Sequence, residues 1–144
     1  MMFGQNRQQL RQFFFDVWSK IQHRQPLEGL ELVLAHIIDM HPEYHSLLSD
    51  PDNRDKDFIV ETGESNPFLH MGLHISLHEQ VNTDRPSGIR ALYQQLLLRF
   101  DNAHDCEHAM MDCLAETLWQ SQRSGQPPSD ELYLQALHRL LEQN

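Results

Sequence analysis

Basic side chains are scarce in this sequence. Its 144 residues include 11 lysines and arginines against 21 aspartates and glutamates, which gives a formal net charge of −10 at pH 7. Nucleic acids and anionic membrane surfaces are bound by clustered basic side chains that neutralise phosphates. The charge balance therefore argues against a nucleic-acid partner and against binding to an anionic membrane.

Cysteines and long apolar runs are also scarce. Only Cys106 and Cys113 are present, seven residues apart in one expected helix. Two such residues suit reduced thiols better than the disulfide framework of a small secreted domain. The first 25 residues contain neither a long apolar run nor a small-residue cleavage site, so we see no signal peptide and no membrane span. We therefore expect a cytoplasmic protein.

The alternation of apolar and polar residues that is typical of strands is missing, whereas helical periodicity runs through almost the whole chain. The length suits one domain with one core. The sequence thus predicts an all-α protein. We expect a single-domain helical bundle over residues 1–144, with four main helices plus a short C-terminal helix.

Prolines and polar stretches place the first expected helix boundaries. A first helix should cover about 8–23, and a second should begin at Pro26 and be bent or restarted at Pro42. A long acidic connection is expected at about 50–66.

The second half of the chain has its own boundary signals. Ser65 or Asn66 would cap a third helix that has Pro67 in its first turn and ends at the stretch NTDRPSG. A fourth helix is expected to run without interruption over about 88–122. The turn-prone stretch SGQPPSD should separate it from a final helix over about 131–143.

Histidine is the residue that stands out, with ten in the chain. The stretch NPFLHMGLHISLHEQ places His70, His74 and His78 four residues apart. On a helix each step of four turns by about 40° and rises by about 6 Å, so the three side chains form a column on one face. The flanks of the column are apolar: Met71, Ile75, Leu77 and Val81. We therefore expect the column to point into the core.

The same reasoning brings donors from two other segments to the interior. His41 and His45 lie near the apolar line of the second helix if its turn survives Pro42. In the expected 88–122 helix, Glu107 falls near the centre of the apolar stripe, and two more histidines lie at its inner edge and one step outward, His104 and His108. The remaining histidines fall on outer or boundary positions: His23, His36 and His138.

Burying seven imidazoles and a carboxylate without partners would cost about 1–3 kcal/mol for each group, a sum comparable to the stability of a whole domain. A transition-metal ion offsets this cost because imidazoles and carboxylates are its ligands. The predicted ligands are the pairs His41 and His45, His74 and His78, and His104 and His108. Glu107 is expected to bridge or to accept a hydrogen bond from a ligand.

His70 is added as a seventh histidine. His70 and His78 start about 12 Å apart along the helix axis, so the three histidines of the column cannot all bind a single ion. Either the site holds two ions, or one histidine contacts a ligand without binding the metal itself. A histidine-rich site with one or two carboxylates, in a bundle core that excludes water, suits redox or oxygen chemistry at iron. We therefore favour iron over zinc. A shell filled entirely by protein would instead indicate a structural zinc.

A metal-free alternative also fits the pattern. The histidines would then form a buried hydrogen-bonded network, or line a groove for a partner, in a protein-interaction module. The sequence identifies no particular protein partner. It also shows no nucleophile with a matched base, so the question of catalysis stays open.

Two resemblances complement this reading. The ligand set resembles, in kind, the di-iron bundles of the hemerythrin family, but HPEYH, HMGLHISLH and HDCEH do not match that family's ligand spacing, so no ligand can be carried across. The chain is also similar over nearly its whole length to a family of short, uncharacterised bacterial proteins known only as a domain of unknown function. The stretches NPFLHMGLHISLHEQ and TDRPSGIR carry this similarity. It implies a bacterial cytosolic protein and assigns no cofactor or catalytic residue.

Overall fold

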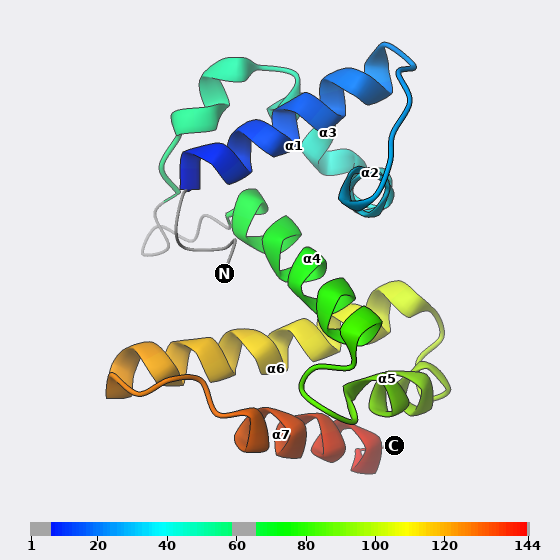
Figure 1. The fold of residues 1–144 in the computed structure, drawn as a ribbon, viewed down its shortest axis with the longest axis vertical. Coiled ribbons are helices and arrows are strands. Elements are labelled where there is room, and N and C mark those ends of the chain that lie inside the picture. Colours follow the sequence, from blue (N-terminus) through cyan, green and yellow to red (C-terminus); the bar gives the residue numbers. More distant parts are fainter. Residues whose placement is uncertain (1–6, 59–65, 144) are drawn as a thin grey trace. The chain divides into compact units, whose positions relative to one another are not determined.

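The computed structural model describes residues 7–58 and 66–143, and all the regular structure in these ranges is helical (Figure 1). The all-α class is therefore confirmed. The chain divides into two compact units, Met1–Gly72 and Leu73–Asn144. Within the described ranges, no helix combines the length and the apolar character needed to cross a membrane.

The first unit is built on α1 (Arg7–Gln22), which packs against α2 (Leu30–Asp39). The 3-10 turn η1 (Pro42–Tyr44), the short helix α3 (His45–Leu48) and a second 3-10 turn, η2 (Pro51–Asp55), follow. Both α3 and η2 contact α1. The buried apolar side chains of this unit are Phe14, Val17, Leu34, Ile37, Ile38, Leu48, Phe68 and Met71.

The second helix starts later than the predicted Pro26. Gly29 has φ 58, in the left-handed region, and the helix begins at the next residue, Leu30. Glycine adopts this backbone without the steric penalty of a Cβ, so the chain turns here instead of propagating a helix from Pro26. The predicted restart at Pro42 is confirmed, because α2 ends at Asp39 and η1 begins at Pro42.

A buried arginine ties the acidic connection to α1. Arg11 is only 3% exposed, and its Nη1 donates to the backbone carbonyls of Arg54 and Lys56 at 2.9 and 2.8 Å. Its guanidinium also lies 4.4 Å from the ring centroid of Phe68. The described part of the connection is thus a docked segment that includes η2, whereas Ser65 lies outside the described residues.

The third predicted helix is α4 (Pro67–Thr83), and the boundary between the two units falls inside it. Asn66 caps it as predicted, because its Oδ1 accepts from the backbone amides of Phe68 and Leu69 at 3.0 and 3.1 Å. The TDRPSG stretch ends it as predicted. Asp84 has φ 52, and its Oδ1 accepts from the Gly88 and Arg90 amides at 3.1 and 3.0 Å.

The second unit contains the rest of α4 with α5 (Ile89–Leu97), α6 (Ala103–Ser124) and α7 (Asp130–Glu142). Helix α7 packs against both α5 and α6, and Figure 1 shows α7 alongside α6. The buried cluster between them consists of Leu77, Ile89, Leu92, Leu96, Cys106, Met110, Met111, Leu114, Tyr133 and Leu137.

The prediction of one uninterrupted helix over 88–122 was wrong. The chain leaves helical structure after Leu97, and a new helix starts with Asn102 as its N-cap. The Asn102 side chain accepts from the backbone amide of Asp105 at 2.8 Å, which satisfies one of the amides that a helix start leaves open. Leu98, at the break, is 85% exposed, so no apolar packing holds the chain in helix there.

Candidate metal-binding histidines

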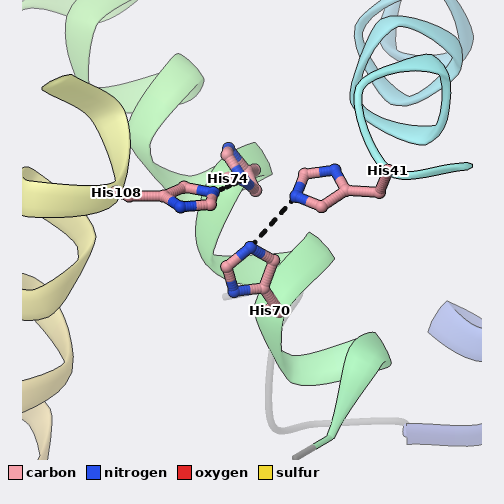
Figure 2. Close-up of side chains that lie close together, drawn as sticks. All are labelled: His41, His70, His74 and His108. Atoms are coloured by element: carbon pink, nitrogen blue, oxygen red, sulfur yellow. Dashed lines mark hydrogen bonds between the residues drawn. The ribbon is translucent and has the colours of Figure 1, made fainter. Parts of the chain in front are cut away.

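The first unit contains a histidine pair formed by His41 and His70. His41 follows α2 and caps η1, and its Nδ1 donates to the backbone carbonyl of Ile37 at 2.7 Å. This bond places the proton of a neutral imidazole on Nδ1, so Nε2 carries the lone pair. That Nε2 lies 3.1 Å from Nε2 of His70 on α4 (Figure 2). The ring of Tyr44 stacks on His41 with a centroid separation of 5.1 Å.

The second unit contains a matching pair formed by His74 and His108. His74 on α4 is fully buried, and its Nε2 lies 3.2 Å from Nε2 of His108 on α6 (Figure 2). The other ring nitrogen of His74, Nδ1, faces Oε1 of Glu107 at 3.5 Å. Both buried histidines, His41 and His74, thus direct Nε2 to a second imidazole, and Nδ1 of each lies near an oxygen atom, at 2.7 Å for His41 and 3.5 Å for His74.

The separation within each pair suits two kinds of interaction. Two nitrogens bound to one ion at 2.0–2.1 Å lie about 2.9 Å apart at a right angle and about 3.3 Å apart at the tetrahedral angle. The observed 3.1 and 3.2 Å fall between these limits, and they are also normal hydrogen-bond lengths. Each pair could therefore contribute two imidazole nitrogens to a metal ion.

Glu107 on α6 is the buried carboxylate of the second unit, with 4% of its surface exposed. Its Oε1 lies 3.2 Å from Nε2 of His78 and 3.5 Å from Nδ1 of His74, and its Oε2 is 3.5 Å from the Tyr93 hydroxyl. Burial alone would raise the pKa of Glu107, but the close approach of His74 and His78 overcomes this effect and lowers the pKa to about 2. Glu107 is therefore an anion at neutral pH, placed behind His74.

Comparison with known proteins adds a family. Residues 6–139 match the family described as Domain of unknown function (DUF1841). The chain belongs to the DUF1841 family. No curated protein and no solved structure matches it. Membership confirms the similarity carried by NPFLHMGLHISLHEQ and TDRPSGIR, and it assigns no activity. The resemblance of the ligand set to hemerythrins gains no support from these comparisons.

The predicted orientation of the histidines in this DUF1841 chain agrees with their burial. His41 and His74 are buried, and five others are partly buried: His45, His70, His78, His104 and His108. The three histidines predicted to lie outside are exposed: His23, His36 and His138. Glu107 is buried, as its place in the apolar stripe predicted.

The predicted pairing within the DUF1841 chain differs from the observed neighbours. His41 faces His70, whereas His45 donates from Nε2 to the carbonyl of Ile38 at 3.0 Å and lies against the Trp18 ring at 4.6 Å. The ring of His104 lies 4.1 Å from that of His108. Metal binding by any of these side chains stays a prediction.

Two neighbours of the candidate residues do not follow from the sequence. The hydroxyl of Tyr93 lies 3.5 Å from Oε2 of Glu107, a contact that helical periodicity does not indicate. The carbonyl of Ile37, which sets the tautomer of His41, carries no sequence signal because every residue has one. Its distance of four residues from His41 was the available hint.

Proposed function

We propose that this protein binds transition-metal ions through a pair of facing imidazoles in each unit, His41 with His70 in the first and His74 with His108 in the second. The observation that carries the proposal is the arrangement within each pair. Two Nε2 atoms face each other at 3.1 Å in one pair and 3.2 Å in the other. At the same time, Nδ1 of His41 donates to a backbone carbonyl, and Nδ1 of His74 lies 3.5 Å from a carboxylate oxygen. Metal-bound histidines commonly direct their second nitrogen to a carbonyl or carboxylate in this way.

The register of α4 supports the proposal. His70 and His74 lie four residues apart on this helix, so their Cα atoms differ by a rise of about 6 Å and a rotation of about 40°. One helix face therefore supplies one member of each pair.

We further propose iron ahead of zinc as the bound ion. The proposed donors are imidazoles with the anionic Glu107 behind His74, and nitrogen donors of this kind suit iron as well as zinc, nickel and copper. An iron ion with an open position would support redox or oxygen chemistry, whereas four protein ligands closed around zinc would make it structural. We also propose a cytoplasmic location, since both cysteines are free.

A metal-free histidine network is the second candidate function. The same 3.1 and 3.2 Å separations favour it, because one protonated and one unprotonated Nε2 form a normal hydrogen bond. The protein would then act as an interaction module whose histidines hold its helices together.

Elemental analysis separates the two candidates. We expect protein purified without a histidine tag to retain near-stoichiometric metal after desalting, and His74→Ala to lose the metal that the His74–His108 pair holds. His23→Ala, which changes an exposed histidine, is the matched control and should retain the metal. An absorption spectrum of the same sample distinguishes iron from zinc. Wild-type protein that carries no metal even after reconstitution would overturn the proposal in favour of the network.

A further inference from the structure

A small cavity opens beside Glu107 within the second unit. Its volume is about 220 Å³, and its walls come from α4, α5 and α6: Leu77, His78, Val81, Asn82, Tyr93 and Glu107. One wall is apolar, and the other presents an imidazole, a carboxylate and a phenol hydroxyl. An engineered cavity of about 150 Å³ binds benzene, so this one has room for an ion with several water molecules.

Two buried polar atoms at this cavity lack a well-directed hydrogen bond. They are Nε2 of His78 and Oε1 of Glu107, which lie 3.2 Å apart. Buried polar atoms in proteins nearly always have a hydrogen-bond partner or an ion. Only 4% of the Glu107 surface is exposed, so bulk water does not solvate its carboxylate. His78 is 30% exposed, which leaves a route from solvent.

The spacing of the two atoms matches that of adjacent ligands on an ion. Bonds of about 2.1 Å to a nitrogen and an oxygen 3.2 Å apart enclose an angle of about 100°, between the octahedral and tetrahedral values. The Tyr93 hydroxyl approaches the other oxygen of the carboxylate, Oε2, at 3.5 Å, whereas Oε1 faces Nε2 of His78 at 3.2 Å and Nδ1 of His74 at 3.5 Å.

We propose that this cavity is a second metal site, in which Nε2 of His78 and Oε1 of Glu107 bind a divalent transition-metal ion and water fills the remaining positions. One imidazole and one carboxylate suit Mn²⁺, Fe²⁺, Co²⁺ or Zn²⁺. Because two protein ligands leave at least two positions open, this ion is able to bind and activate water or a small substrate in the cavity. The inference goes beyond the proposed function and does not depend on His41 or His70.

Cobalt binding to the full chain tests this site. Metal-free protein, prepared with a chelator, is dialysed against Co²⁺, and bound ions are counted while the visible spectrum reports their coordination. We expect His78→Ala to bind one ion fewer than the wild type, with at least a tenfold weaker affinity at the altered site. Glu107→Gln, which keeps the shape of the buried side chain, should give the same result. His138→Ala, which changes an exposed histidine of the same unit, should bind as many ions as the wild type.

A His41→Ala variant distinguishes this site from the proposed function. It should lose the ion of the His41–His70 pair and keep the one held by His78 and Glu107. The second site is refuted if His78→Ala binds as many ions as the wild type, or if the wild type binds a single ion that disappears in His41→Ala. A single ion that is lost in His78→Ala and kept in His41→Ala supports the second site and refutes metal binding by the His41–His70 pair. Circular dichroism establishes that each variant is folded.

Discussion

His41→Ala tests whether the observed pairing, rather than the pairing predicted from the sequence, holds the metal. His41 is 2% exposed, and its Nε2 faces His70 at 3.1 Å. Removing a residue that merely orients a ligand weakens metal binding by about 10–100-fold. Loss of one of the two paired ligands should exceed this, so we expect at least about a 100-fold loss of affinity at the His41–His70 pair, or about 2.7 kcal/mol.

The same variant also loses a structural hydrogen bond. Without metal, His41→Ala removes the bond to the Ile37 carbonyl and leaves a buried space, so the free energy of unfolding should fall by about 1–3 kcal/mol. His45→Ala is the matched control, because it removes a comparable bond to the Ile38 carbonyl without touching either pair. It should lower the stability of the metal-free protein by about 0.5–1.5 kcal/mol and leave metal affinity unchanged.

The assay combines competition with a chelator of known affinity and thermal unfolding of the metal-free form. The two readouts separate a ligand from a residue that only stabilises the fold. Equal losses of affinity in His41→Ala and His45→Ala would show that affinity follows stability. Unchanged affinity in a folded His41→Ala would show that His41 is not a ligand. Either result refutes the reasoning.

Three further predictions concern the helical framework. Burial raises the pKa of all three tyrosines above 10.0, Tyr93 to about 12 and Tyr44 and Tyr133 in the same direction. The fold favours the neutral form of these tyrosines. Their contribution to the free energy of unfolding is therefore complete below about pH 10 and is lost as the pH rises through their pKa values in the folded protein. An alkaline titration followed by absorbance should show no tyrosine that ionises with a midpoint near pH 10 in the native protein. A tyrosine that ionises there would contradict the prediction. Arg11→Ala should lower the free energy of unfolding by about 2 kcal/mol or more in urea denaturation, since two backbone carbonyls lose the buried guanidinium as their donor. A change below about 0.5 kcal/mol would refute the docking role. Asn102→Ala should lower the free energy of unfolding by about 1 kcal/mol in the same assay. Asn102→Asp should retain most of this stability, because aspartate also caps a helix. Equal losses of stability in the two variants would exclude a capping role.

The helices that the sequence predicted well are those with strong local signals. Asn66 and Pro67 start α4, and Asp84 with Gly88 ends it, all through contacts between residues close in the sequence. The break before α6 was missed although Asn102 is a good cap. The apolar periodicity on both sides of Asn102 continues in phase closely enough to suggest a single helix.

The inward direction of the histidines followed from residues within one or two helical turns. The column on α4 and the buried position of Glu107 depend only on helical periodicity and on the apolar character of their neighbours. These features are properties of individual helices. They could therefore be predicted before any tertiary contact was known.

The partner of each histidine was decided by the folded chain. His41 meets His70, 29 residues away, and His74 meets His108, 34 residues away. Helical periodicity predicts which way a side chain points. It does not predict how two helices are rotated and shifted relative to each other. That rotation and shift result from the packing of whole apolar faces. The pairs, the contact of Glu107 with His78 and the cavity beside it consequently came only from the tertiary structure.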